Sequence, residues 1–147
     1  MYRGGIILKT PEQLDAMAAA GRIHARCLKM LMASCRPGIT TTELDAIAEK
    51  FIRSQGATPS FKGYRGFPGS ICASPNDMVV HGIPGPYRLE EGDTVSVDVG
   101  VTLEGFVADG AYTFAVGDID PEVQRLLETC QAALDAGIVE ARVGQRI

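Results

Sequence analysis

Two aspartates inside a valine-rich hairpin constrain this chain more than any other feature. The stretch VSVDVGVTLEGFVADGAYTF, residues 95–114, holds two apolar runs joined by a turn that contains Gly105. Its alternating pattern predicts a pair of β-strands, and strand interiors disfavour aspartate. Asp98 and Asp109 therefore require a reason beyond the stability of the sheet.

The strand pattern predicts that both aspartates lie on one face of the hairpin. Successive side chains of a strand point to opposite faces, so the valines at 95, 97, 99 and 101 lie opposite Asp98, and the aromatic residues at 106, 112 and 114 lie opposite Asp109. A two-residue loop at Leu103-Glu104 would pair the two aspartates directly. A three-residue loop with Gly105 left-handed would need a bulge to restore that facing.

Carboxylates that converge in this way would repel each other unless cations lie between them. Divalent metal ions shared by carboxylates are one solution. The alternative is that Asp98 or Asp109 caps a turn, pairs with Arg65 or Arg88, or lies on a solvated face of the sheet.

Composition excludes several classes of protein. The 147 residues are 46% hydrophobic and 22% charged, which is typical of one soluble domain with a real core. A formal charge of -4 and scattered Lys and Arg residues argue against nucleic-acid binding. No segment approaches the roughly 18 apolar residues of a membrane span. Four widely spaced cysteines favour reduced thiols in a cytoplasmic protein.

Capping patterns predict three helices. The first begins after Thr10, with Pro11 at its first position, and ends at 36–38. The second begins after Thr40 and ends at Gly56, and the third begins after Asp120. The first helix is expected to bury one apolar stripe: Leu14, Met17, Ala18, Gly21, Ala25, Leu28, Leu31, Met32 and Cys35. The third has its own apolar side: Val123, Leu126, Leu127, Cys130, Leu134, Gly137 and Ile138.

A loop at 57–70 separates the second helix from short β runs expected at 71–74, 78–83, in the hairpin and at 113–117. The start of the first helix, Thr10-Pro11-Glu12, recurs as Asp120-Pro121-Glu122, and RPG at 36–38 is echoed by RVG at 142–144. The pattern predicts one domain over 1–147, with a first repeat at about 10–117 and the start of a second at 120–147. Chance likeness of capped helices is the alternative.

Two longer stretches resemble a known family. GYRGFPGSICASPNDMVVHGIP at 63–84 and EEGDTVSVDVGVTLEGFVADGAYTF at 90–114 closely resemble type I methionine aminopeptidases, and the resemblance runs from about Ile7 to the end. It implies the duplicated pita-bread fold, an α+β fold in which helices cover an antiparallel sheet. It also implies a cytoplasmic enzyme, usually monomeric, that removes the N-terminal methionine of nascent polypeptides, with the ribosome as a candidate partner and with no membrane or nucleic-acid contact.

The resemblance also implies residue roles. Asp98 is similar to the family's terminal metal ligand, and Asp109 to the carboxylate that bridges two divalent ions, which would be Co, Mn, Fe, Zn or Ni. His81 is similar to the catalytic imidazole that contacts substrate near the scissile peptide. Positions that line the methionine side-chain pocket hold Tyr64, Phe67 and Cys72, which suits an apolar, sulfur-tolerant site.

Two departures from the family pattern affect the expected activity. Gly110 follows Asp109 where the family commonly has Thr. The family's remaining ligands, a His and two Glu, belong to the second half of the fold, and no histidine follows Asp109 in this sequence. We therefore expect the N-terminal portion of such an enzyme, inactive alone.

Two other functions remain open: a related pita-bread hydrolase acting on Xaa-Pro bonds or a creatine-like substrate, and a non-catalytic binding module. The short segment before Thr10 favours the aminopeptidase over prolidase-like relatives, which usually carry an extra N-terminal domain. The joint presence of His81, Asp98 and Asp109 disfavours the binding module.

Overall fold

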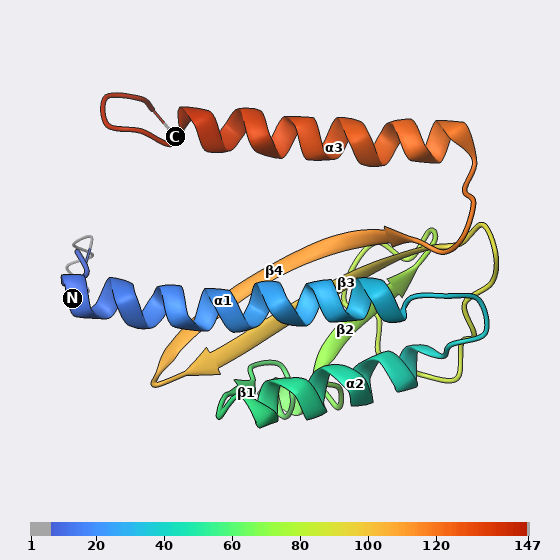
Figure 1. Cartoon of the computed structure of the whole chain (residues 1–147), viewed down its shortest axis with the longest axis horizontal. Coiled ribbons are helices and arrows are strands. Elements are labelled where there is room, and N and C mark those ends of the chain that lie inside the picture. The colour runs from blue at the N-terminus through green and yellow to red at the C-terminus, as the bar shows by residue number, and fades with distance from the viewer. Residues whose placement is uncertain (1–6, 147) are drawn as a thin grey trace.

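The computed structural model describes residues 7–146, which form an antiparallel sheet and three α-helices (Figure 1). The domain limits expected at residues 1 and 147 lie outside this range. In chain order the elements are α1 (Pro11–Ser34), α2 (Thr41–Ser54), β1 (Thr58–Pro59), the 3-10 helix η1 (Tyr64–Gly66), β2 (Ile71–Pro75), β3 (Thr94–Leu103), β4 (Phe106–Ala115) and α3 (Pro121–Glu140).

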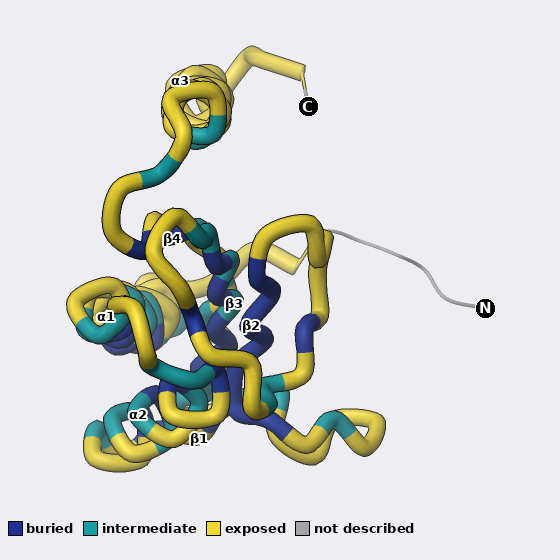
Figure 2. The backbone as a smooth tube through the Cα atoms, turned by 90° about the vertical axis from the view of Figure 1, so that its right-hand side faces the viewer, coloured by how far each residue is buried: buried dark blue, intermediate teal, exposed yellow. Residues whose placement is uncertain are grey.

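Strand β3 is the centre of the sheet. It pairs with β4 along one edge and with β1 and β2 along the other, always antiparallel. Helix α1 packs against β3 and β4, and α2 packs against β1 and β2. The four valines of β3 are fully buried, as their alternation predicts. We call the sheet together with α1 and α2 the body, and Figure 2 shows the buried strands in its middle.

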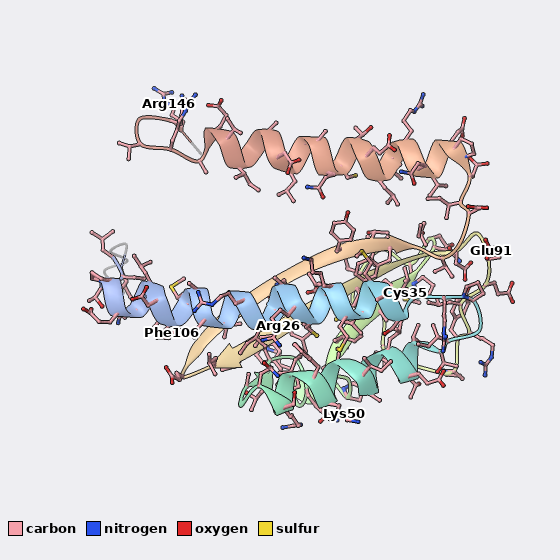
Figure 3. All side chains as sticks on the ribbon, in the orientation of Figure 1. Arg26, Cys35, Lys50, Glu91, Phe106 and Arg146 are labelled. Carbon is pink, nitrogen blue, oxygen red and sulfur yellow. The ribbon has the colours of Figure 1, made fainter. Side chains whose placement is uncertain are left out.

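The predicted helix starts are confirmed. Thr10 and Thr40 each form a reciprocal capping box, with Gln13 and Glu43 respectively, and the Asp120 side chain accepts from the Glu122 N–H. Arg26 then joins α1 to α2, since its guanidinium donates to Gln55 and lies 5.4 Å from the centroid of the Phe51 ring (Figure 3).

The face that α1 turns to the sheet differs from the predicted one. Its buried side chains are Ala20, Ile23, Cys27 and Leu31. Of the predicted stripe, Leu31 alone is buried, whereas Leu14, Met17 and Met32 are exposed. Two apolar stripes overlap on this helix, and the one with smaller side chains packs against the valines of β3. In α2 the buried apolar side chains are Leu44, Ala48 and Ile52.

The strand predicted at 78–83 is a loop, so this prediction was wrong. His81 has a left-handed backbone with φ 59°, and the Gly82 N–H donates to the Ser74 hydroxyl instead of to a neighbouring strand. Val79 and Val80 are exposed. The run predicted at 113–117 is also not separate, because β4 continues without a break to Ala115.

The hairpin turn has two residues and lies one residue later than the predicted loop at Leu103-Glu104. Leu103 pairs with Phe106, so the turn consists of Glu104 and Gly105, both left-handed with φ 50° and 82°. This turn needs no bulge, and both predicted registers are wrong. Asp98 pairs with Ala111, while Asp109 pairs with Gly100. The aspartates are therefore diagonal neighbours on one face, which confirms the strand-face prediction.

Helix α3 stands apart from the rest of the described chain (Figures 1 and 2). It has no buried residue, and Leu126, Leu134 and Ile138 of its predicted apolar side are exposed. Within residues 7–146, no helix is long and apolar enough to cross a membrane. The four cysteines are free thiols, as predicted.

Candidate active site

One cavity of about 530 Å³ brings together all six residues selected from the sequence. They come from the loop before β2, from β2 itself, from the loop that follows it and from the β3–β4 hairpin: Tyr64, Phe67, Cys72, His81, Asp98 and Asp109. A larger hollow of about 720 Å³ beside Arg36 and Glu43 lies at the turn between α1 and α2 and contains none of these residues. Chemistry, not size, identifies the candidate site.

The two aspartates form a strained acidic pair. Oδ1 of Asp98 is buried and has no hydrogen-bond partner in the described part of the chain. Burial and then the negative charge of Asp109 raise the pKa of Asp98 to about 6, while the charges of His81 and His24 act in the opposite direction. A buried carboxylate oxygen without a donor is suited to a cation.

His81 is held at the cavity by the backbone of the residue that follows it. A Cβ on Gly82 would lie 2.1 Å from the carbonyl oxygen of Ala73, so only glycine fits there. The Gly82 N–H donates to Ser74 Oγ at 3.0 Å, and the Gly82 carbonyl accepts from the Ala73 N–H at 2.9 Å. These contacts fix the left-handed His81 against β2, with its side chain exposed toward the cavity.

The opposite wall is mostly apolar. Phe61 packs so closely on Gly100 that a Cβ there would lie 2.6 Å from the ring, which explains a glycine among the valines of β3. Tyr64 and Phe67 border the cavity from the same loop. Cys72 lies on β2 directly opposite Asp98, and burial together with the charges of Asp98 and Asp109 raises the pKa of its thiol to about 11.

The acidic pair fits part of a metal site. Among the described residues, no group of three or more His, Cys, Asp or Glu side chains is placed to hold a metal ion. Neither aspartate forms an ion pair within residues 7–146, so the alternative pairing with Arg65 or Arg88 does not occur. Oxygen donors with an unpartnered buried atom match the preference of hard divalent cations, and these residues would supply two of the ligands that such a site needs.

His24 explains one departure from the family pattern. Its Nε2 lies 3.1 Å from the carbonyl oxygen of Gly110. A Cβ on Gly110 would lie 3.0 Å from His24 Cε1, which is tighter than ordinary contact. The His24 ring thus takes space that a side chain at position 110 would need, which gives His24 a structural role.

The chain is similar in sequence and in structure to known metallopeptidases. Residues 15–147 match the model of metallopeptidase family M24, and the chain belongs to that family. Its sequence is 51% identical over 142 residues to a methionine aminopeptidase of Clostridium perfringens, covering 97% of this chain. The structure is similar to that of methionine aminopeptidase from Rickettsia prowazekii, with a TM-score of 0.89, 36% identity and 91% of this chain covered.

The likeness to other pita-bread enzymes is weaker. Xaa-Pro dipeptidase from Bacillus anthracis matches 80% of this chain at 26% identity, with a TM-score of 0.70. The chain spans 57% of the length of the Clostridium protein and 54% of the Rickettsia chain. The resemblance to methionine aminopeptidases and the pita-bread α+β fold, over about half of the reference length, are therefore confirmed.

Several cavity residues were not selected from the sequence: Phe61, Arg65, Gly66, Pro68 and Ile83. Most of them lie inside motifs that had already been recognised, next to Tyr64, Phe67 or His81. Phe61 could have been found from the apolar side chains that persist in the otherwise turn-like loop at 57–70.

Proposed function

We propose that this chain supplies one wall of a methionine aminopeptidase site, which removes the N-terminal methionine of polypeptides. The observation that carries the proposal is the meeting of an acidic pair, an exposed histidine and an apolar loop around one cavity. In this proposal Asp98 and Asp109 would be ligands of divalent metal whose element is unidentified. The first repeat covers about 10–117, and α3 begins the second.

Each remaining residue has a role that its position supports. Tyr64, Phe67 and Cys72 receive the methionine side chain, because aromatic and sulfur-containing groups make favourable contacts with a thioether. His81, exposed at the rim, donates a hydrogen bond to the substrate near the scissile peptide. The metal ions, when bound, supply Lewis acidity that makes a bound water acidic and polarises a carbonyl.

The 147-residue chain alone is proposed to have little or no activity. A hydrolytic metal pair needs several ligands whose geometry is fixed by surrounding contacts, and residues 7–146 place no three ionisable ligands together. Divalent metal should therefore bind weakly through Asp98 and Asp109.

A comparison of the chain with a completed version tests this function. The 147 residues would be fused to the second half of the Clostridium protein, and both forms assayed on a Met-Ala-Ser peptide with Mn²⁺ or Co²⁺. We expect turnover by the fusion alone, lost on Asp109→Ala and strongly reduced on His81→Ala. Turnover by the 147-residue chain equal to that of the fusion would contradict the proposal that it is incomplete.

The same fusion separates the competing functions. Cleavage of Ala-Pro but not of Met-Ala-Ser would instead support an Xaa-Pro hydrolase. Retained peptide binding without cleavage of either substrate, at saturating metal, would support the binding module. An inactive variant that still folds, such as Asp109→Asn, is the control for contaminating peptidases.

A further inference from the structure

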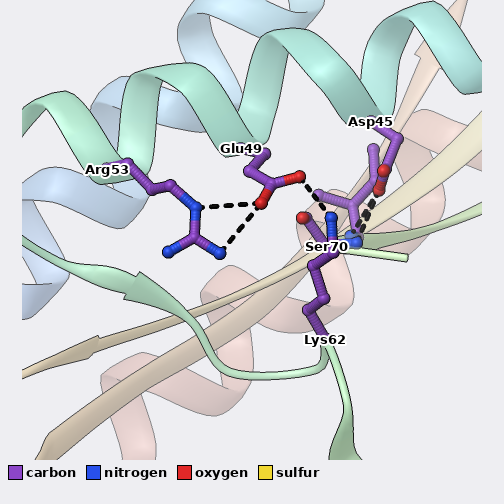
Figure 4. A network of polar contacts seen from close by, with 6 residues as sticks. Asp45, Glu49, Arg53, Lys62 and Ser70 are labelled. Atoms are coloured by element: carbon purple, nitrogen blue, oxygen red, sulfur yellow. Dashed lines mark hydrogen bonds and ion pairs between the residues drawn. The ribbon is translucent and has the colours of Figure 1, made fainter. Parts of the chain in front are cut away.

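The loop that forms the apolar wall of the cavity is held at both ends by one helix. This loop, defined as residues 61–68, contributes six cavity residues: Phe61, Tyr64, Arg65, Gly66, Phe67 and Pro68. Near its start, Lys62 Nζ contacts Glu49 on α2 at 2.5 Å. Just after its end, the N–H groups of Ser70 and Ile71 donate to Asp45 on α2 at 2.6 and 3.0 Å. Figure 4 shows these contacts on one side of α2.

Between these two anchors the loop is closed mainly upon itself. The Gly63 N–H donates to the Phe67 carbonyl and the Phe67 N–H to the Tyr64 carbonyl, at 2.8 and 2.9 Å. Its backbone has left-handed conformations at Gly63, Arg65 and Gly66, and Tyr64 is 64% exposed. A small closed turn of this kind can swing as a unit if its anchors fail.

Asp45 and Glu49 lie one helical turn apart, so they occupy neighbouring positions on one face of α2. Glu49 uses its two oxygens separately: Oε1 pairs with Arg53 on the same helix and Oε2 with Lys62 of the loop. These contacts, with Lys62 the larger cause, lower the pKa of Glu49 to about 2. Neither Asp45 nor Glu49 borders the cavity.

We propose that Asp45 and Glu49 are positioning residues that set the width of the apolar recess by anchoring the 61–68 loop to α2. They touch neither substrate nor metal and act through Lys62 and the Ser70 and Ile71 amides. The inference rests on the proposed function for its biological meaning, because the width of the recess matters only if it receives a substrate side chain.

Cys72 provides a direct readout of the loop. Its thiol borders the cavity together with the loop residues, yet it is only 6% exposed. Cys27 is fully buried in the core, and Cys130 is exposed on α3. Opening of the loop should expose Cys72 alone, whereas loss of overall stability should expose Cys72 and Cys27 together.

The test measures alkylation of each cysteine by iodoacetamide in the purified 147-residue chain, followed by peptide mass spectrometry. Lys62→Met removes the loop anchor, and the matched control Arg53→Met removes the other partner of Glu49 without touching the loop. We expect alkylation of Cys72 to be several-fold faster in Lys62→Met, with Cys27 unchanged, and to stay at the original rate in Arg53→Met and in the rescue variant Lys62→Arg. Asp45→Ala, which removes the oxygen that accepts from the Ser70 and Ile71 N–H groups, should also expose Cys72.

Two outcomes would overturn the proposal. Unchanged alkylation of Cys72 in Lys62→Met and Asp45→Ala would mean that the loop needs no anchor on α2. Parallel acceleration at Cys72 and Cys27 would mean that the contacts stabilise the fold generally. Because this readout needs neither metal nor turnover, a completed enzyme that cleaves no peptide would refute the proposed function and leave the anchoring result standing.

Discussion

Helices α1 and α3 begin alike and have different environments. Both start with proline after a residue whose side-chain oxygen accepts a backbone N–H, Thr10 in one case and Asp120 in the other. Helix α1 buries four side chains against the sheet, whereas α3 buries none. Local sequence is sufficient to place the start of a helix, but burial requires a partner surface.

The apolar side of α3 shows what such a stripe can and cannot specify. Leu126, Leu134 and Ile138 are 59%, 58% and 62% exposed, although they lie on the side expected to be buried. An amphipathic pattern indicates that a helix has a face suited to packing. It does not indicate which surface will cover that face.

Truncation of a buried leucine should have the largest effect and should separate the two helices most clearly. Leu31→Ala in α1 removes a fully buried side chain and should lower the free energy of unfolding by about 2–5 kcal/mol. Leu134→Ala in α3, at an exposed site, should change it by less than about 0.5 kcal/mol. Urea unfolding followed by circular dichroism measures both.

Equal losses of unfolding free energy in the two leucine variants would contradict the expected difference between α1 and α3. They would mean that α3 packs on another surface in solution, either in the same chain or in a second copy. Sedimentation at several protein concentrations distinguishes these two cases.

The contact between His24 and Gly110 gives the next largest effect. Gly110→Thr adds a side chain where a Cβ alone would lie 3.0 Å from the His24 ring, and it should cost about 1–3 kcal/mol through overpacking. His24→Ala removes the obstructing ring, so the double variant should recover most of the loss. The measurement is a double-mutant cycle by urea unfolding.

Additive losses in that cycle would show that His24 and residue 110 do not compete for space. The same substitution at Gly137 of α3, where nothing lies within 4 Å of an added Cβ, is the control for the intrinsic cost of threonine in this chain. That variant should leave the unfolding of the sheet unchanged.

Much of the body could be predicted because short-range rules govern it, whereas most of the site residues were selected through the family resemblance. Capping residues fixed the helix starts, and alternation along β3 correctly predicted its buried valines and the shared face of Asp98 and Asp109. The six site residues came from two motifs that fold into neighbouring strands and loops. Their meeting at one cavity needed the hairpin, which is itself a local structure.

The wrong predictions depended on information that the local sequence does not hold. The register of the hairpin depends on Glu104 adopting φ 50°. Non-glycine residues rarely adopt this left-handed conformation, so the sequence does not predict it. The run at 78–83 has the composition of a strand, but its Gly82 N–H bonds to Ser74. Packing against the sheet determines which of the two apolar stripes on α1 is buried. Asp45 lies 25 residues before Ser70, and Glu49 lies 13 residues before Lys62. No motif in the sequence reveals these anchors.

Alanine at two helical glycines should produce a smaller, opposite effect. Gly21 and Gly137 both have open space around an added Cβ, and alanine is favoured over glycine in helices by about 0.8–1 kcal/mol. Gly21→Ala should raise the unfolding free energy of the body by up to that amount, because α1 shares its core. Gly137→Ala should increase the helix content, as far-UV circular dichroism would show, and should leave the unfolding free energy of the body unchanged.

A stabilisation of the body by Gly137→Ala as large as that by Gly21→Ala would show that the two helices unfold together. Helix α3 contains no tyrosine, so tyrosine fluorescence, to which Tyr64, Tyr87 and Tyr112 contribute, follows the unfolding of the body. Measurement of both signals in one titration removes the uncertainty about which part unfolds.

The smallest expected effect concerns pH and compares two surface ion pairs. Contacts with Lys62 and Arg53 hold the pKa of Glu49 at about 2, below its ordinary 4.5. A lowered carboxyl pKa adds stability that is present above pH 4.5 and is lost as pH falls toward 2. Because the pairs are partly exposed to solvent, Glu49→Gln should cost only about 0.5 kcal/mol at pH 6.5, and this difference from the original chain should shrink below pH 4.5.

The control is Glu140→Gln, which breaks the exposed contact at 3.4 Å between the last residue of α3 and Arg142. This variant should cost nothing measurable at pH 6.5. Urea unfolding at pH 6.5, 4.5 and 3 provides the comparison, and a loss for Glu49→Gln that is constant over this range would show that its ion pairs do not contribute to stability.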